Sequence, residues 1–316
     1  MDVRDEQALT AVKLYFEKGL SQAEVAQEMG VSRPTASKLI QHGKQRGFVT
    51  IQINDPRKTN SELAQRITEA YRLHEVRLAQ VPRDNAADML RELGRLGADV
   101  LTEQVHDNMK VGVSWGNTLY AVAQQLVSTD VHGVEIVQLK GGTSHSQHST
   151  KDLGTINRFC SAFNARARTL PLPVIFDNVE AKRIVEQDRH IAHILQLGRE
   201  TDIVIFTVGE VRPKSLLLNL GYLTELEVAE LVNRAAGDAC SRFYTTDGDI
   251  ALPSVDERTV GISLNDLAAR PIRILVAGGA DKAIAIHTAL RMGLATHLVI
   301  DQATAIRVLS LAQDED

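Results

Sequence analysis

Short apolar runs that alternate with helical patterns constrain this chain more than any other feature of its sequence. The runs resemble buried strands and lie at 75–81, 110–115, 134–139, 172–176, 203–208, 260–264, 273–278 and 297–301. Apolar residues at helical spacing indicate helices at 61–72, 86–106, 117–128, 179–199, 224–235 and 281–292. Near-continuous apolar strands that alternate with helices predict an α/β fold, in which a mostly parallel sheet is covered on both faces.

Residues 5–48 follow a different pattern, in which short helices are separated by tight turns. Ser21 can cap one helix and forms a capping box with the glutamate three residues later, and Ser32 can cap the next helix. Gly30 permits the turn between these helices, and Ala26 is small where they would cross. These offsets are typical of a helix-turn-helix.

The chain therefore divides into a small N-terminal domain and a larger one. The alternating segment 49–54 predicts a short strand that would form a wing, so we predict a winged helix-turn-helix over 1–54. The polar, proline-containing segment 55–60 is the predicted linker, and 61–316 is the predicted effector-binding and oligomerisation domain.

Charge is distributed in a way that favours DNA binding by the small domain. The net charge of the whole chain is -5, yet residues 31–54 contain no Asp or Glu. A locally basic helix on an acidic protein is what attraction to phosphates requires. We predict that the exposed face of this helix includes Ala36 and His42, and that the DNA-binding residues are Gln22, Ser32, Arg33, Thr35, Lys38, His42, Lys44 and Arg46. The alternative is a small helical bundle with a solvated basic face, or a protein-docking module.

Composition narrows the class of protein further. Hydrophobic residues make up 44% and charged residues 24% of the chain, which is typical of a globular protein. The two cysteines, Cys160 and Cys240, are too few and too far apart for a disulfide framework. The charged N-terminus lacks the apolar stretch of a signal peptide, and no apolar run reaches the roughly 18 residues of a membrane span. We expect a cytoplasmic protein with no membrane partner.

Eight segments, in this order, carry a resemblance to a known family. They are LSQAEVAQEMGVSRPTASKLI near the N-terminus, VGVSWGNT (111–118), VQLKGGTSHS (137–146), LPLPVIFDN (170–178), VGEVR (208–212), GDACSRF (237–243), RTVGI (258–262) and LVAGGADKAIAIH (275–287). Over essentially its whole length the chain resembles the SorC family of sugar-binding transcriptional regulators. The resemblance implies a winged-helix DNA-binding domain and a Rossmann-like effector domain related to sugar-phosphate isomerases. It also implies a homodimer or tetramer, and a phosphorylated sugar as effector; for the subgroup it resembles most, this is deoxyribose 5-phosphate or a close relative.

Two glycine-containing junctions are candidates for the phosphate-binding part of an effector site. The first follows a strand and opens a helix, and its candidate residues are Ser114, Gly116, Asn117 and Thr118. The second follows another strand and comprises Gly278 and Gly279, with Lys282 one turn later. Because unpaired N–H groups converge at a helix N-terminus, both junctions suit an anion. We expect Lys282 and the 114–118 loop to share the phosphate.

Lys140 ends an apolar run and precedes Gly141, so its amine is expected at the carboxyl end of a strand, where open α/β sheets bind ligands. Desolvation there would leave some free amine at neutral pH, and a free amine can attack the aldehyde of an opened sugar. We therefore predict that Lys140 and Gly141 belong to the effector site, and hypothesise that Lys140 contacts the carbonyl carbon of the effector and can form a reversible Schiff base. The alternative is a surface lysine that follows a strand.

Several other polar residues are open to two interpretations. Asp238 is a candidate ligand for a sugar hydroxyl or the N-cap of a helix, and Trp115 could cover the ligand or belong to the core. Asp177 and Asn178 could line the site or make a turn. The histidines of 145–148 are better explained by a mobile polar loop than by a metal site, so we predict neither a metal nor a cofactor.

The sequence thus favours a transcriptional regulator, and two classes of enzyme are the alternatives. We predict that it represses genes of deoxyribonucleoside or sugar catabolism, with operator affinity controlled by a sugar phosphate. One alternative is an isomerase or aldolase-like enzyme that uses Lys140. The other is a hydrolase, because Gly112, Ser114 and Gly116 also satisfy G-x-S-x-G, and Asp238 and His287 follow in triad order.

Overall fold

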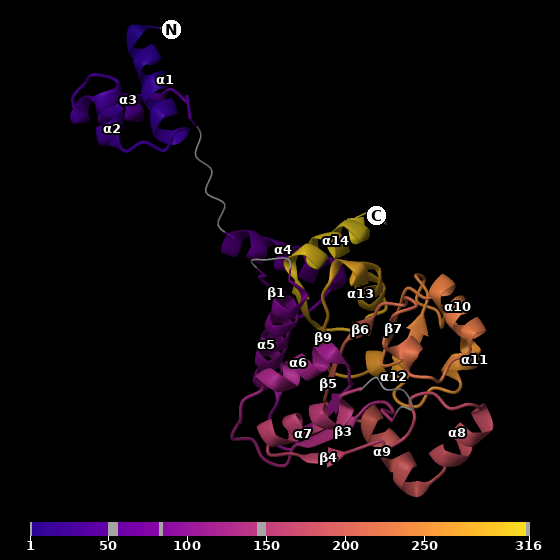
Figure 1. The fold of residues 1–316 in the computed structure, drawn as a ribbon. Helices are drawn as coiled ribbons and strands as arrows, with labels where there is room; N and C mark the ends of the chain where they lie inside the picture. Colours follow the sequence, from indigo (N-terminus) through magenta and orange to yellow (C-terminus); the bar gives the residue numbers. More distant parts are fainter. Residues whose placement is uncertain (1, 50–55, 82–84, 144–149, 314–316) are drawn as a thin grey trace. The chain divides into compact units, whose positions relative to one another are not determined.

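The computed structural model describes residues 2–49, 56–81, 85–143 and 150–313 (Figure 1). The chain divides into two compact units, Met1–Pro56 and Arg57–Asp316. In the described part of the chain, no helix combines the length and apolar character that a membrane crossing requires.

The N-terminal unit contains the helix-turn-helix. Its helices are α1 (Val3–Phe16), α2 (Gln22–Glu28) and α3 (Arg33–Gln45). The capping box at Ser21 and the cap at Ser32 are confirmed, since each side chain accepts a hydrogen bond from the third residue of its helix. Val25, Ala26 and Leu39 are buried in the core of this unit. The predicted wing at 49–54 lies almost entirely outside the described residues.

A close helix contact explains the late glycine of α3. A Cβ atom at Gly43 would lie 2.4 Å from Cγ2 of Val12 in α1. Only glycine therefore lets α1 and α3 pack this closely, and α3 continues through this position to Gln45.

The larger unit is built on a seven-stranded parallel sheet with strand order β1-β10-β9-β5-β2-β3-β4. The strands are β1 (Glu75–Ala79), β2 (Lys110–Val113), β3 (Glu135–Gln138), β4 (Arg166–Arg168), β5 (Ile203–Phe206), β9 (Ile272–Val276) and β10 (His297–Asp301). A small antiparallel sheet joins β6 (Val208–Gly209), β7 (Gly237–Ala239) and β8 (Arg242–Tyr244). The predicted α/β class with a mostly parallel sheet is confirmed.

Helices cover both faces of the parallel sheet (Figure 1). One face packs against α5 (Ala86–Gln104), α6 (Asn117–Gln125) and α7 (Asp152–Ala162). The other packs against α4 (Pro56–Tyr71), α12 (Leu264–Ala268), α13 (Ala283–Arg291) and α14 (Gln302–Gln313). The remaining helices are α8 (Val179–Glu186), α9 (Arg189–Arg199), α10 (Glu225–Arg234), α11 (Pro253–Asp256) and the 3-10 turns η1 (Leu217–Asn219) and η2 (Ala280–Lys282).

The structure differs from the sequence pattern in several segments. The predicted strands 172–176 and 260–264 make only isolated bridges, such as the one that joins Ile175 to Thr259. The predicted helix 179–199 is split into α8 and α9, because Asp188 caps a new helix. The predicted linker 55–60 is helical from Pro56 onward, so α4 begins earlier than the predicted helix 61–72.

Candidate effector site and nucleic-acid interface

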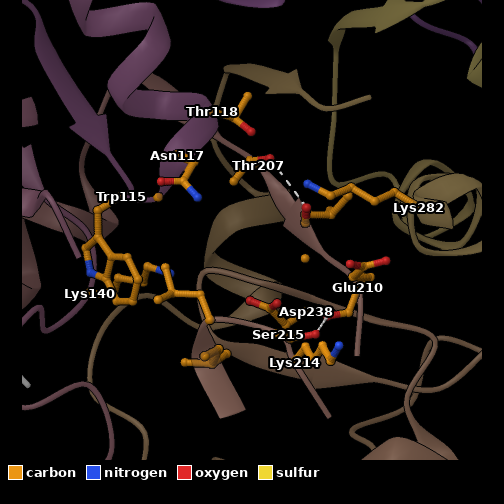
Figure 2. Close-up of a pocket in the computed structure, with 15 residues that line it drawn as sticks. Trp115, Asn117, Thr118, Lys140, Thr207, Glu210, Lys214, Ser215, Asp238 and Lys282 are labelled. Carbon is orange, nitrogen blue, oxygen red and sulfur yellow. Dashed lines mark hydrogen bonds between the residues drawn. The ribbon is translucent and has the colours of Figure 1, made fainter. Parts of the chain in front are cut away.

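A cavity of about 250 Å³ opens at the carboxyl ends of β2, β3 and β5 (Figure 2). From β2 the chain continues outward to β3 and β4, whereas β5 lies on the other side of β2. The cavity therefore lies at a topological switch point, where open α/β sheets bind ligands. Its walls are formed by Trp115, Gly116, Asn117, Thr118, Lys140, Thr207, Val208, Gly209, Glu210, Lys214, Ser215, Leu216, Leu217, Asp238 and Lys282.

The β2–α6 junction forms one wall of the cavity. Gly116 precedes α6 with φ 138° and ψ 174°, a backbone conformation that glycine alone adopts without strain, and no side chain caps the helix. The first N–H groups of α6 thus lie at a cavity wall lined by Asn117 and Thr118. Ser114 does not line the cavity: it is 2% exposed, and its hydroxyl contacts the buried thiol of Cys240.

Lys140 follows β3 and is buried beside the cavity. Its Nζ donates to Oγ of Ser241 at 2.9 Å and lies 3.7 Å from the centroid of the Trp115 ring. Burial lowers the pKa of Lys140, and the Asp238 carboxylate only partly opposes this effect. Trp115 in turn donates from Nε1 to the carbonyl of Gly141 at 2.7 Å. The tryptophan is therefore both a buried packing residue and a support for the lysine.

Two further charged groups face the same space. Asp238 lies in β7, not at the start of a helix, so the N-cap alternative is wrong. Its Oδ2 accepts a hydrogen bond from the Ser241 amide at 3.1 Å, and burial raises its pKa. Lys282 ends η2 on the opposite wall; burial lowers its pKa, and the carboxylates of Asp238 and Glu210 oppose that change.

The other predicted glycines do not line this cavity. A Cβ at Gly141 would lie 2.4 Å from the carbonyl oxygen of Pro173, so this glycine permits two chain segments to approach closely. The amide of Gly279 already donates to Oδ2 of Asp301 at 2.8 Å, and a Cβ at Gly278 would lie 2.6 Å from the same oxygen. Gly279 lines a separate cavity of about 410 Å³, together with Asp301. The structure therefore does not bring Gly141, Gly278 or Gly279 to the wall of this cavity.

The segment that follows β5 adds residues to the site that were not predicted from the sequence. Thr207, Glu210, Lys214 and Ser215 line the cavity from the side opposite β3. A usable signal was present, because Glu210 follows closely after the apolar run 203–208, as Lys140 follows the run 134–139.

The remaining polar candidates belong elsewhere. Asn178 caps α8 by accepting from the Ala181 amide at 2.8 Å, and Asp177 is exposed outside the cavity lining, which favours the turn interpretation. Residues 145–148 lie outside the described part of the chain. Within the described part, no cluster of three or more His, Cys, Asp or Glu side chains could hold a metal ion.

The hydrolase alternative does not fit the arrangement of its three residues. Nδ1 of His287 lies 2.6 Å from Oη of Tyr71 in α4, whereas Asp238 lines the effector cavity. Ser114 is buried next to Cys240 instead. Among the described residues, these side chains do not form a triad.

In the N-terminal unit, α3 presents the predicted basic face only in part. Arg33, Thr35, Lys38 and Lys44 are exposed, and the hydroxyls of Ser32 and Thr35 are 2.8 Å apart at the helix start. Gln22 is half-buried at the start of α2. Ala36 is fully buried, so the expectation that it belongs to the exposed face is wrong, because this side of α3 packs in the unit's core.

A buried carboxylate of α1, which was not predicted from the sequence, contacts the C-terminal end of α3. Asp5 of α1 is 4% exposed; its Oδ1 lies 2.9 Å from Nε2 of His42, and its Oδ2 accepts from Arg46 at 2.9 Å. These bonds hold the pKa of Asp5 below its usual value, the His42 contact contributing most. His42 is thus half-buried against α1 and not on the exposed face, whereas Arg46 is still more than half exposed.

Comparisons with known proteins agree with this arrangement. The Sugar-bind family model, a sugar-binding domain, matches residues 55–310, and the MarR family model matches residues 2–58. The deoxyribonucleoside regulator of Bacillus subtilis (strain 168) is 44% identical over 304 residues, which are 96% of this chain and 97% of the relative.

Two solved structures share the fold. A domain of a possible sugar-binding transcriptional regulator from Arthrobacter aurescens TC1 superposes with a TM-score of 0.73 at 31% identity, covering 81% of this chain and 100% of that one. The full-length sorbitol operon regulator SorC from Klebsiella pneumoniae gives a TM-score of 0.71 at 24% identity, covering 98% and 100%. The relatives named here are regulators and not enzymes. This chain therefore belongs to the family of transcriptional regulators that carry this sugar-binding domain, together with the deoxyribonucleoside regulator of Bacillus subtilis.

Proposed function

We propose that this regulator is a repressor whose operator affinity is controlled by a phosphorylated sugar, bound in the cavity beside β2, β3 and β5. The observation that carries the proposal is the set of phosphate-binding groups at this cavity: the amines of Lys214 and Lys282 line it together with the uncapped N-terminus of α6, beside the carboxylates of Asp238 and Glu210. Helix N-termini and lysines both bind phosphate groups. The name of the Bacillus subtilis relative, a deoxyribonucleoside regulator, favours deoxyribose 5-phosphate or a close relative as the effector.

The polar groups of the cavity suit the two ends of such a ligand. The phosphate fits against the start of α6 and the amine of Lys282. Asp238 and Glu210 offer carboxylate oxygens, which accept strong hydrogen bonds from sugar hydroxyls. The ring or open chain of the sugar would then extend toward Lys140.

Lys140 is the residue that could bind the effector covalently. Its free amine would add to the aldehyde carbon of the opened sugar, and the resulting carbinolamine would lose water to give an imine. Burial favours this chemistry because it lowers the pKa of the amine. Borohydride treatment with deoxyribose 5-phosphate should add the mass of the reduced adduct to the peptide that contains Lys140. If no adduct forms while the sugar phosphate binds, Lys140 acts only as a hydrogen-bond donor.

Calorimetry on the full chain tests the effector class. We expect deoxyribose 5-phosphate to bind and to raise the melting temperature, because a ligand of the folded state stabilises it. Deoxyribose without phosphate and inorganic phosphate alone should each bind far more weakly. Equal binding of the free sugar would contradict the phosphate assignment, and no binding of any pentose or hexose phosphate would contradict the effector proposal.

Gel-shift experiments with upstream DNA test the other half of the proposal. A homodimer or tetramer would place paired α3 helices in successive major grooves, about 34 Å apart. We expect the effector to weaken DNA binding by roughly 5- to 150-fold, the range that a coupling of about 1–3 kcal/mol produces. Arg33→Ala should weaken binding and reduce its salt dependence, whereas Arg199→Ala, which removes an exposed cation of α9, should not. Tighter DNA binding with effector would contradict repression by release.

A further inference from the structure

The turn between β7 and β8 has an unusual backbone for its sequence. Its two central residues, Cys240 and Ser241, have φ values of 49° and 68°, so both are left-handed. Two-residue hairpin turns with this geometry normally contain asparagine or glycine, because other side chains are strained there. Cys240 and Ser241 are also almost fully buried. Because the turn is strained and buried and contains no glycine, we expect one of its side chains to have a functional role.

Ser241 makes the contact that could explain this strain. Its Oγ accepts the hydrogen bond from Nζ of Lys140 at 2.9 Å, across 101 residues of sequence. Both side chains are buried, Ser241 at 0% and Lys140 at 5% exposure. The Ser241 amide also donates to Asp238, a second residue of the effector cavity. One residue of the turn thus contacts two groups that face the ligand space.

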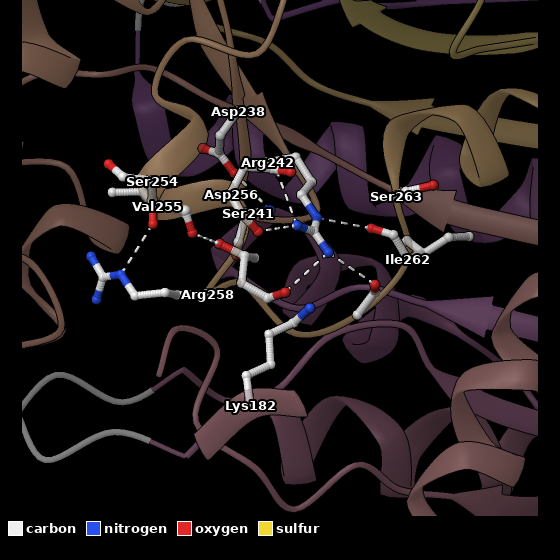
Figure 3. A network of polar contacts seen from close by, with 12 residues as sticks. Lys182, Asp238, Ser241, Arg242, Ser254, Val255, Asp256, Arg258, Ile262 and Ser263 are labelled. Carbon is white, nitrogen blue, oxygen red and sulfur yellow. Dashed lines mark hydrogen bonds and ion pairs between the residues drawn. The ribbon is translucent and has the colours of Figure 1, made fainter. Parts of the chain in front are cut away.

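Arg242, the next residue, holds the turn in place (Figure 3). Its guanidinium is buried and donates to the carbonyl oxygens of Asp256, Thr259, Gly261 and Ile262 at distances between 2.6 and 3.3 Å. This segment also pairs with the backbone around Lys140, since the Ile262 amide donates to the carbonyl of Leu139 at 2.8 Å. The same clamp therefore fixes the serine and the backbone on either side of the lysine.

We propose that Ser241 is a positioning residue that aims the amine of Lys140 into the effector cavity, and that the left-handed turn and the Arg242 clamp exist to hold its hydroxyl there. This inference rests on the proposed effector site, but it concerns an internal contact that exists without any ligand. Asp238 and Cys240, the titratable groups that also face Lys140, are unchanged in the variants described next.

The test measures the titration of Lys140 directly, by brief labelling with trace acetic anhydride across a range of pH, followed by mass spectrometry of its peptide. The full-length variants are Ser241→Gly, which removes the hydroxyl and relieves the left-handed strain, and Ser241→Ala, which removes only the hydroxyl. The hydroxyl oxygen stabilises the charged amine more than the neutral one. Both variants should therefore lower the midpoint of Lys140 labelling by about one pH unit, the value of one hydrogen bond to a charged group.

Three comparisons make the result decisive. Lys282, in the same cavity but without a Ser241 contact, should keep its wild-type midpoint. Ser241→Gly should melt at or above the wild-type temperature, so that a shift in Lys140 is not a consequence of unfolding. Wild-type labelling curves in both variants, or a Lys140 that is not labelled at any pH in the native protein, would overturn the proposal.

Effector binding separates this inference from the proposed function. Ser241→Gly should weaken deoxyribose 5-phosphate binding roughly 10-fold, because the amine is no longer held toward the ligand. If the Lys140 midpoint moves but the sugar phosphate does not bind the wild type, the proposed function fails while the serine–lysine contact stands. If the sugar phosphate binds wild type and variant equally, Ser241 does not serve the site.

Discussion

Two strand-to-helix junctions in this protein have similar sequences, but their backbone N–H groups have different surroundings. At the β2–α6 junction, Gly116 opens a helix whose first N–H groups face a cavity. At the β9–η2 junction, Gly279 donates its amide to the carboxylate of Asp301. The register of the neighbouring strand explains the difference. Val299 of β10 pairs with Val276 of β9, so Asp301 reaches the level of Gly278 two residues later.

In this protein a glycine junction is therefore open to an external anion only where the adjacent strand does not supply a carboxylate. Asp301 accepts hydrogen bonds from the amides of Gly279 and Thr304 and from the Thr304 hydroxyl. It therefore acts as the internal anion of the second junction. Thr207, a neutral residue, follows β5 at the first junction and leaves that space for a ligand.

The largest effect is expected from Asp301→Ala. The change leaves buried donors of Gly279 and Thr304 without an acceptor, so the free energy of unfolding should fall by about 3–5 kcal/mol. Urea unfolding measures this loss. Asp301→Asn is the matched control and should cost less, because its amide oxygen can still accept. Wild-type stability of the alanine variant would show that the second junction needs no internal anion.

The next largest effect is expected from Lys282→Met, which removes the cation that follows the second junction but faces the first cavity. Affinity for deoxyribose 5-phosphate should fall roughly 10- to 100-fold, the value of a hydrogen bond to a charged group, while the free energy of unfolding should not decrease. Calorimetry and urea unfolding measure the two quantities. Lys214→Met, at an exposed position of the same cavity, should have a smaller effect on affinity. If Lys214→Met lowered the affinity more than Lys282→Met does, the phosphate would lie at the mouth of the cavity.

Gly116→Ala and Gly279→Ala form a matched pair that tests the two junctions directly. Both glycines have positive φ, 138° and 100°, and a Cβ at either would meet no atom closer than 3.8 Å. Each substitution should therefore cost about 1–3 kcal/mol in unfolding free energy through backbone strain alone. Only Gly116→Ala should also weaken effector binding, because it shifts the start of α6. Equal losses of affinity would mean that both junctions contact the ligand.

These junctions also show how far the sequence alone can predict a site. The polar residues that end β3 and open α6 could be predicted, because the carboxyl ends of parallel strands share one edge. The carboxylate that pairs with the second junction could not be predicted, because Asp301 reaches Gly279 only through the pairing of β10 with β9. Local patterns name the residues at a sheet edge, but the strand register decides which of them meet.

The other omissions have similar causes. The hairpin that carries Asp238 and Ser241 consists of two three-residue strands, which are too short to show a periodicity. In α3, the spacing predicted the helix and its cap, but the burial of Ala36 depends on how three helices cross. Asp5 looked like an ordinary acidic residue of the first turn of α1, and its contact with His42 joins residues 37 positions apart.

The smallest expected effect is a pH dependence that separates the two junctions. Burial lowers the pKa of Lys282 below 10.5, so the folded state releases this proton at lower pH than the unfolded state. At pH values below the pKa of Lys282 in the folded protein, the amine is protonated in both states, and its buried charge opposes folding fully. Between that pKa and 10.5 the unfolded state binds more protons than the folded state. The free energy of unfolding therefore rises with pH across this range. The gain in unfolding free energy from Lys282→Met should therefore be larger at about pH 7 than at about pH 10, as urea unfolding can measure. Gly279→Ala changes no ionisable group, so its loss of stability should be the same at both values. If Lys282→Met changes the free energy of unfolding equally at both pH values, the amine of Lys282 is not desolvated. The two junctions would then differ in shape but not in buried charge.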